Sequence, residues 1–233
     1  MLSFEFANKD SYLDFGIYVE KRPSLPSPKR RVSYLSVPGR NGNLKYDENT
    51  YEDITLALEC GVIGDVYSRI DEIKAWLLGS GENNLIFSFQ SDKCFIAQVV
   101  NSIDFEVSLR RIGKFVIVFN CRPFKYAVQN NPFIIINSGT NLINTGTLPS
   151  EPLIEVFGSG NITLKINEQE VILTAVSGKI ILNSVLQDAY DDSLENKNNN
   201  MKGDFFFLEV GDNHISWVGN VTKLVITPNW RWL

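Results

Sequence analysis

Hydrophobic and polar positions alternate most regularly between residues 54 and 60. Every second side chain is apolar, and the positions between them hold Thr55, Ala57 and Glu59. Successive side chains of a strand point to opposite faces of its sheet, so this alternation predicts a β-strand with one face on a core. The apolar positions are Ile54, Leu56, Leu58 and Cys60.

The residues just before this strand, 31–51, predict a β-hairpin with a different composition. Val32 to Val37 is rich in β-branched and aromatic residues, which favours a strand. Asn41-Gly42 predicts a two-residue type I′ turn, because that turn needs positive φ at both central positions. The hairpin has too little apolar surface to form a core alone, because its arms carry the charged side chains Arg30, Arg31, Arg40, Lys45, Asp47 and Glu48.

This hairpin has two interpretations. It is either an ordinary surface hairpin folded back on its own domain, or an arm that packs on a neighbouring subunit. In the second interpretation the candidate inter-subunit contacts are Tyr34, Leu35, Arg40, Asn41, Leu44 and Tyr46.

A single amphipathic helix is predicted after the strand. Val66, Ile70, Ile73 and Leu77 follow one another at helical spacing and form one apolar stripe. Asp65 can cap the start of this helix, and Gly79 is expected as the residue directly after its end. We expect the helix to cover the open side of a sheet.

Strand patterns make up the rest of the first half. Residues 1–20 predict a pair of strands with a turn at Lys9 to Ser11, and 115–121 is so apolar that both faces of that strand are expected to be buried. Residues 126–131 are the expected boundary between two domains, 1–130 and 131–233. The first domain is therefore predicted to be β-structure with one helix and a long hairpin.

Glycines divide the second half into short segments. Gly158-Ser159-Gly160, Ser177-Gly178 and Gly219-Asn220 are predicted to be tight turns between short strands. Short, evenly spaced strands are typical of a β-sandwich or jelly roll. The Asn-rich stretch 188–203 is predicted to be a long mobile loop.

Charge and composition narrow the class of protein. The 233 residues carry a net charge of −5; residues 1–132 hold 16 basic and 16 acidic side chains, and residues 133–233 hold 6 and 11. The second half therefore lacks the basic surface that nucleic-acid binding needs. The longest apolar runs are too short to span a membrane, and the N-terminus has no signal-peptide pattern. The sequence has three widely spaced cysteines, Cys60, Cys94 and Cys121. We expect them to be buried free thiols of a protein made in a reducing compartment.

No residue pattern indicates catalysis, a cofactor or a metal. His214 is the only histidine, and it lies without a nucleophile motif in Gly211 to His214, an expected turn. The cysteines lack zinc-ligand spacing, and the three aspartates between 188 and 192 lack the glycine and glutamate of a calcium loop. Trp217, Trp230 and Trp232 fit either a sugar-binding platform or, more simply, burial in a core. We therefore expect a protein that is not an enzyme and holds neither cofactor nor metal.

The order and spacing of several short motifs resemble the distal tail proteins (Dit) of long-tailed siphophages that infect Gram-positive bacteria, and their prophage relatives. The resemblance covers essentially the whole chain. In the first half the motifs are Val37 to Leu44 (VPGRNGNL), Tyr51, Ile54 to Cys60, Ile73 to Leu77 (IKAWL) and Cys121 to Phe124 (CRPF). In the second half they are Asn144 to Thr147 (NTGT) with Pro149 and Pro152, Gly158 to Ile162, Gly211 to Ile215 and Pro228 to Trp232.

This resemblance implies a mainly-β fold: an N-terminal β-sandwich or barrel like that of tail-tube proteins, with one α-helix and a long hairpin arm, followed by a C-terminal galectin-like β-sandwich. It implies a virion structural protein at the tail tip, made in the host bacterial cytoplasm. The expected assembly is a homo-hexameric ring, single or as two stacked rings. Its expected partners are the tail tube protein, the tail-associated lysin or tip protein and the receptor-binding protein, with DNA passing through the lumen unbound and no membrane contact.

A different function stays open for the second domain. A β-sandwich with exposed tryptophan can bind carbohydrate on a host surface, so a carbohydrate-binding protein used for adsorption is the alternative. The galectin pattern of sugar-binding residues is not present in this sequence, and a shared fold does not by itself transfer a function.

Overall fold

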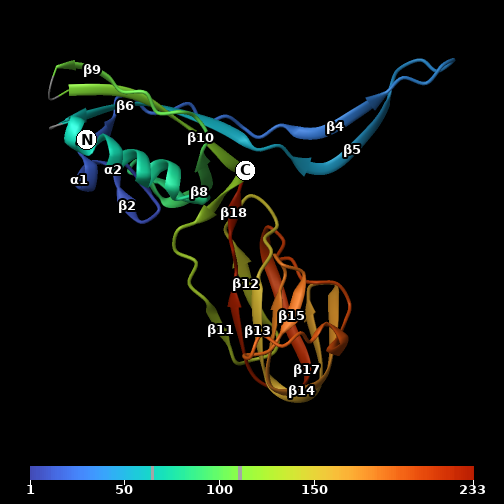
Figure 1. Cartoon of the computed structure of the whole chain (residues 1–233). Helices are drawn as coiled ribbons and strands as arrows, with labels where there is room; N and C mark the ends of the chain where they lie inside the picture. The colour runs from blue at the N-terminus through green and yellow to red at the C-terminus, as the bar shows by residue number, and fades with distance from the viewer. Residues whose placement is uncertain (64–65, 110–111) are drawn as a thin grey trace. The chain divides into compact units, whose positions relative to one another are not determined.

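The computed structural model describes residues 1–63, 66–109 and 112–233, and most of them lie in strands (Figure 1). The mainly-β class is confirmed. The chain divides into two compact units, which we call unit 1 (Met1–Val128, with Leu233) and unit 2 (Gln129–Trp232). Within the described residues no helix is long and apolar enough to cross a bilayer.

Unit 1 is built on one curled antiparallel sheet. Its strands follow the order β2-β1-β7-β8-β10-β6-β3, and β9 pairs with β10. The strands are β1 (Phe4–Phe6), β2 (Lys9–Asp10), β3 (Ile17–Val19), β6 (Ile54–Ile63), β7 (Asn83–Phe87), β8 (Gln90–Val99), β9 (Glu106–Leu109) and β10 (Ile112–Ala127).

The alternation in β6 places one face of this strand on the core, as predicted. Its four apolar side chains are buried, whereas Thr55, Ala57 and Glu59 are exposed. The prediction that both faces of residues 115–121 are buried is wrong. Ile117 and Phe119 have no exposed surface, but Val116 is 44 % exposed. The reason is that β10 has only one face on the core. Val116 pairs with the exposed Glu59 of β6, so both side chains lie on the outer face of the sheet.

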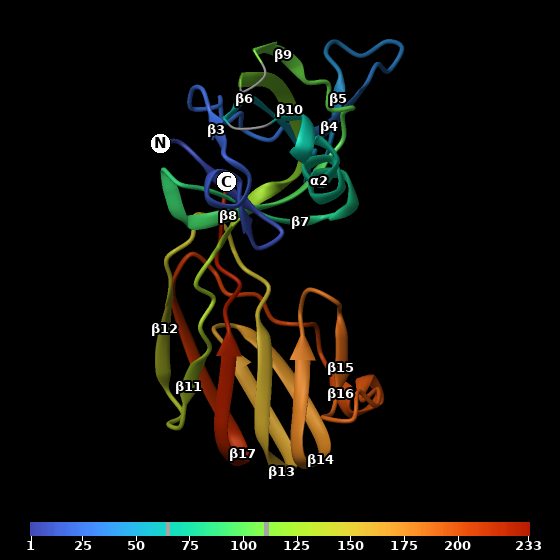
Figure 2. The ribbon, with the colours of Figure 1, turned by 60° about the vertical axis from the view of Figure 1, so that its left-hand side comes forward.

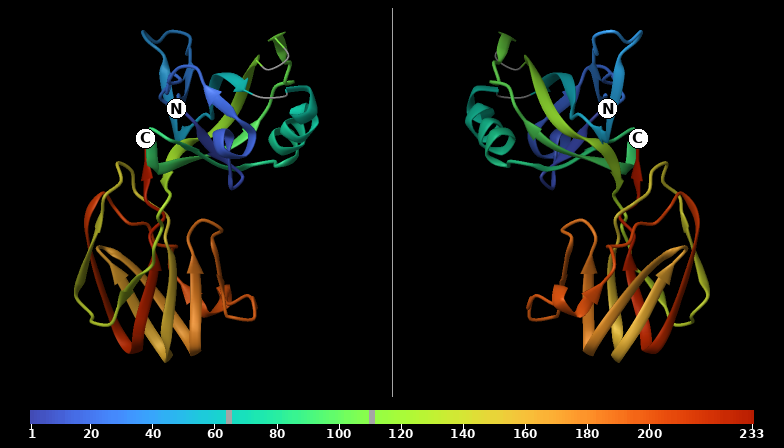
Figure 3. Two further views of the ribbon diagram at one scale, coloured as in Figure 1. Left: turned by 90° about the vertical axis from the view of Figure 1, so that its left-hand side faces the viewer. Right: turned by 90° about the vertical axis from the view of Figure 1, so that its right-hand side faces the viewer.

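The predicted helix is present as α2 (Val66–Gly79), and Figure 3 shows it beside the unit 1 sheet. Ile73 and Leu77 of the predicted stripe are buried, and the expected cap Asp65 lies outside the described residues. Gly79, expected just after the helix, is its last residue. Trp76 fixes the helix on the core: its indole nitrogen donates a hydrogen bond of 2.9 Å to the Phe6 carbonyl, and its ring stacks on Phe15 at 4.3 Å.

A second, short helix was not predicted. α1 (Ser11–Phe15) begins where a simple turn was expected, because the Asp10 carboxylate accepts hydrogen bonds from the backbone N–H groups of Tyr12 and Leu13. Gly16 ends the helix with a left-handed φ of 68°. A five-residue helix has too few positions to show a periodic pattern in the sequence.

Unit 2 is a curled sheet of long strands, which Figure 2 shows side by side. The strand order is β11-β17-β13-β14-β15, with β12 on β17 and β16 on β14. The elements are β11 (Phe133–Ile135), β12 (Thr140–Asn144), β13 (Leu153–Ile166), β14 (Gln169–Asn183), β15 (Asp188–Tyr190), the 3-10 helix η1 (Asn198–Asn200), β16 (Met201–Lys202), β17 (Gly211–Thr227) and β18 (Arg231–Trp232).

The three glycine turns predicted in this half are wrong. Each lies inside one continuous strand: Gly158–Gly160 in β13, Ser177-Gly178 in β14 and Gly219-Asn220 in β17. In the register Gly158 pairs with Gly178, and Ser159 pairs with both Ser177 and Asn220, so the three sites lie in one line across the sheet. The pairing shifts around them, which identifies bulges that bend long strands rather than turns that end short ones.

The stretch 188–203 contains regular structure, so the prediction of a loop without fixed conformation is wrong. It forms β15, η1 and β16. The Asp188 carboxylate accepts hydrogen bonds from the side-chain amides of Asn196 and Asn198, at 2.9 and 2.8 Å. Asparagine side chains here replace the backbone ladder, which an Asn-rich composition alone does not reveal.

The close approach of two strands at the bulges of unit 2 can be tested by substituting their glycines. A β-carbon at Gly158 would lie 2.2 Å from the Asn220 carbonyl oxygen, so Gly158→Ala should lower the free energy of unfolding by about 2–3 kcal/mol. Gly160→Ala is the matched control: its β-carbon would meet nothing within 4 Å, and the φ of 77° should cost only about 1 kcal/mol. Thermal or urea unfolding measures both, and equal costs would contradict the close approach.

Candidate functional site: the hairpin arm

The hairpin at residues 29–51, which we call the arm, is the candidate functional site of unit 1. It consists of β4 (Arg30–Leu35) and β5 (Leu44–Tyr51), which form a separate two-stranded sheet. Figure 1 shows the arm reaching away from the rest of unit 1. The structure therefore does not show a hairpin folded back on its own domain.

The tip of the arm differs from the predicted turn. Asn41 does not have positive φ, so Asn41-Gly42 is not the type I′ turn that was expected. The tight turn is formed earlier, by Val37 to Arg40, where the Arg40 N–H donates to the Val37 carbonyl at 3.1 Å and Gly39 has a φ of 80°. Proline followed by glycine suits the two central positions of a type II turn, and Pro38-Gly39 takes these positions here. The loop between the paired residues Leu35 and Leu44 is therefore wide.

The base of the arm is held by polar contacts. The Arg30 guanidinium donates to the Asp47 carboxylate at 2.8 Å and to the Asn49 side-chain oxygen at 2.5 Å. Asn49 has a φ of 55°, and the strand pairing shifts there, so this is a bulge that twists the hairpin. The Tyr51 ring meets the Phe124 ring of β10 edge-on at 5.6 Å, which attaches the base of the arm to the unit 1 sheet.

The Arg30–Asp47 contact makes the base sensitive to acid. The hydrogen bond from Arg30 is the largest cause that lowers the pKa of Asp47 below its ordinary value. The hydrogen bond from the Asn49 N–H is the second cause. A carboxylate with a lowered pKa adds stability above its unfolded-state pKa, and that contribution is lost as pH falls through the folded-state pKa. The Arg30 side chain is exposed and that of Asp47 is partly exposed, so solvent screens the interaction.

The register divides the arm into two unlike faces. Leu35 pairs with Leu44 and Ser33 pairs with Tyr46, and cross-strand partners project to the same side of a hairpin. One side, which we call the apolar face, therefore holds Leu35, Leu44 and Tyr46, which are 62 %, 44 % and 67 % exposed. The opposite side holds Tyr34 beside Lys45. Exposed apolar side chains gathered on one face of a short hairpin indicate a binding surface.

The structure separates the six residues predicted as inter-subunit contacts. Leu35, Leu44 and Tyr46 share the apolar face, Tyr34 lies on the other face, and Arg40 and Asn41 lie in the tip loop. All six are exposed. Their contact with another subunit stays a prediction.

The tryptophans of unit 2 differ in burial, and its histidine lies in a strand. Trp230 is buried, so it cannot form a sugar platform, whereas Trp217 in β17 is partly exposed. His214 lies within β17 rather than in a turn, and its Nδ1 is 2.9 Å from the Asn141 side-chain oxygen.

The cysteines are free and buried, as predicted. Burial raises the pKa of the Cys60 and Cys121 thiols to about 12, which keeps them protonated at neutral pH. In the part of the chain that the structure describes, no three histidine, cysteine or carboxylate side chains gather as a metal site.

Comparison with known proteins agrees with this geometry. Residues 11–121, most of unit 1, match the family of the phage tail protein RIFT-related domain. The whole chain superposes on the crystal structure of Dit from phage SPP1, described as a paradigm of the hub adsorption apparatus in phages infecting Gram-positive bacteria. That match covers 100 % of both chains with a TM-score of 0.80 and 13 % sequence identity.

Residues 11–121 are a phage tail protein domain, and the whole chain has the fold of a distal tail protein. The resemblance drawn from the short motifs is thereby confirmed, and the comparisons support a Dit-like structural protein of a phage tail. No curated protein sequence matches the chain.

Removal of the arm tip tests whether the arm belongs to the core. Deleting Gly39 to Lys45 removes exposed residues only, so the far-ultraviolet circular dichroism should stay unchanged and the thermal midpoint should move by less than about 3 °C. Loss of the folded signal on deletion would show that unit 1 needs the arm for its own stability.

Proposed function

We propose that this protein forms a ring of six copies at the distal end of a siphophage tail. The ring acts as a hub that joins the tail tube to the tip protein or tail-associated lysin and to the receptor-binding apparatus. The observation that carries the proposal is the arm: its apolar face is exposed and has no partner among the described residues of its own unit. The full-length match to SPP1 Dit, itself described as part of a hub, supports it.

The arm makes ring closure physically reasonable. Each copy gives its arm to one neighbour and receives an arm from the other, so the two surfaces in contact are different. Contacts of this head-to-tail kind generate a closed ring when the rotation between copies divides a full turn. Such a contact needs on the order of 1,000 Å² of buried surface to be stable.

The charge of unit 1 fits a tube through which DNA passes without specific binding. Residues 1–132 carry equal numbers of basic and acidic side chains, so this half has no net positive charge with which to retain phosphates. We place the protein in the virion at the tail tip, after synthesis in the host cytoplasm.

The apolar face of the arm provides the test. The double variant Leu35→Glu/Tyr46→Glu places two charges where burial is proposed, and should weaken ring formation at least about a hundredfold, because buried unpaired charges are costly. Leu186→Glu in unit 2 is the control, since Leu186 is equally exposed, at 68 %, but lies outside the arm. Mass photometry and negative-stain electron microscopy give the readout. Rings of equal abundance in both variants, or a wild-type protein that stays monomeric even with its tube partner, would contradict the proposal.

Carbohydrate binding by unit 2 is the second candidate function, because Trp217 is partly exposed on β17. If this function holds, pulldown on host cell walls should retain the wild-type protein, and the Trp217→Ala variant should be retained up to about tenfold less, since aromatic stacking contributes roughly 0.5–1.5 kcal/mol. A Trp217→Ala variant retained as well as the wild type would remove this candidate.

A further inference from the structure

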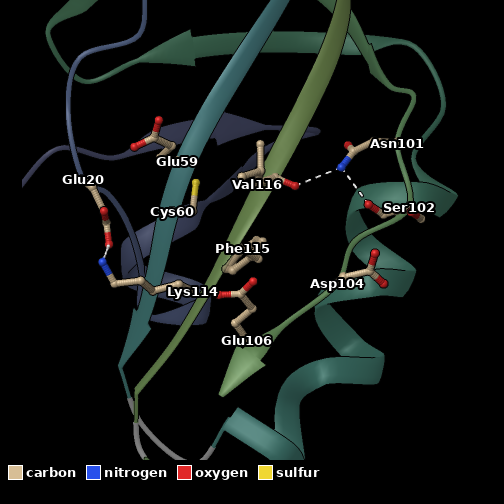
Figure 4. Close-up of a pocket in the computed structure, with 10 residues that line it drawn as sticks. All are labelled: Glu20, Glu59, Cys60, Asn101, Ser102, Asp104, Glu106, Lys114, Phe115 and Val116. Atoms are coloured by element: carbon tan, nitrogen blue, oxygen red, sulfur yellow. Dashed lines mark hydrogen bonds and ion pairs between the residues drawn. The ribbon is translucent and has the colours of Figure 1, made fainter. Parts of the chain in front are cut away.

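A pocket of about 470 Å³ lies in unit 1 beside the N-terminal end of β10. Figure 4 shows it bounded by β6 and β10 on one side and by the 101–106 segment on the other. Its lining contains four carboxylates and one lysine: Glu20, Glu59, Asp104, Glu106 and Lys114. The pocket is therefore acidic, unlike the arm.

Two of these carboxylates already have partners and two do not. Lys114 pairs with Glu20 at 2.7 Å, and Lys21 pairs with Glu59 at 2.8 Å. Asp104 and Glu106 are exposed and make no ion pair with any described residue. Two negative charges at this rim are thus available to a cation from outside the chain.

An apolar strip of the sheet adjoins the acidic rim. Val116 is 44 % exposed, and Val100 on the flanking strand end is 58 % exposed. The Val100 N–H donates to the Val118 carbonyl at 2.9 Å, so the two valines lie on adjacent, paired stretches of backbone. No described residue covers this outer strip of the unit 1 sheet, which leaves it an unpartnered sheet face.

The arm has the complementary chemistry. From Lys29 to Tyr51 it carries five basic and two acidic side chains. Arg31 alternates with Val32 along β4, which places it on the side of the apolar face, and Arg40 lies at the tip. Neither arginine makes an ion pair with a described residue, so the arm offers two unpaired cations and three apolar side chains.

The arm cannot deliver these groups to the pocket of its own chain. Only Glu52 and Asp53 separate β5 from β6, and Figure 1 shows the chain continuing from one strand into the other without reversing. Leu44 and Glu59 are 15 residues apart along this path. At about 3.3 Å per strand residue, up to roughly 50 Å of strand separates the arm end from its own pocket. Arm and pocket therefore lie at opposite ends of unit 1.

We propose that the sheet face formed by Val100 and Val116, with the carboxylates of Asp104 and Glu106 at its rim, receives the arm of the next copy. The apolar face of the arm covers the valines, and Arg31 and Arg40 pair with Asp104 and Glu106. This inference rests on the proposed ring, and it specifies the receiving surface that the ring requires.

Charge reversal tests the pairing without disturbing any ion pair inside a copy. The arm variant Arg31→Glu/Arg40→Glu and the pocket variant Asp104→Lys/Glu106→Lys should each assemble at least about tenfold more weakly than the wild type. Their equimolar mixture should recover assembly, because alternating copies then pair either the reversed or the original charges. Lys202→Glu and Asp204→Lys, exposed residues of unit 2, are the controls and should assemble normally. Reversed variants that assemble like the wild type would overturn the receiving surface and leave the ring itself intact.

Disulfide trapping gives a readout that does not require a stable ring. Leu35→Cys and Val116→Cys proteins, mixed under a mild oxidant, should form a disulfide-linked heterodimer, since the three native thiols are buried. Leu35→Cys mixed with Leu186→Cys is the control and should not. A heterodimer without rings would support the receiving surface and count against the hexameric hub. Rings without this heterodimer would overturn the surface alone, and the absence of both would overturn the two proposals together.

Discussion

The proposed assembly depends on one exposed apolar surface. The arm places Leu35, Leu44 and Tyr46 on one face of a two-stranded sheet, and a two-stranded hairpin has no second layer that could cover them. Apolar surface left in water is unfavourable by about 25 cal/mol per Å², so these side chains favour any arrangement that buries them. A chain that cannot reach its own sheet with this face can bury it only on another molecule.

The body of unit 1 is built to carry such an arm. Stacked rings of Phe15 and Trp76 join α1, α2 and the sheet in one core, and the Trp76 hydrogen bond to Phe6 fixes the helix in position. β6 and β10 pair over ten residues, and the Tyr51–Phe124 contact connects the arm to this stiff pair. A rigid base matters because an arm that is held in one direction loses less conformational entropy on binding than a free one.

Local periodicity was the part of the fold that the sequence revealed. The two-residue period of 54–60 and the stripe through Ile73 and Leu77 predicted β6 and α2, because burial of one face imposes its period directly on the chain. The glycines of unit 2 were misread, since glycine permits a tight turn and a bulge equally. Only the pairing of Gly158 with Gly178 distinguishes the two, and pairing is a long-range property.

In the candidate site, too, local features could be predicted from the sequence and long-range pairing could not. Composition alone indicated that the hairpin lacks a core, but the residues that share its apolar face follow from the register of Leu35 with Leu44. That register depends on where the turn lies, and the Asn41-Gly42 signal competed with Pro38-Gly39 only three residues away. The acidic pocket joins residues as distant in sequence as Glu20 and Lys114, so no local pattern could have revealed it.

The most direct test of the proposed assembly is hydrogen–deuterium exchange of the arm, measured on the purified protein at concentrations below and above the onset of assembly. The outward-facing N–H groups of β4 and β5 are unprotected in an isolated copy and become covered when the arm docks. We predict that backbone protection across residues 30–51 rises with concentration, together with protection around Val100 and Val116. Arm exchange that is slow in the monomer and does not change on assembly would show that the arm is already covered by its own chain, and would contradict docking of the arm on another copy.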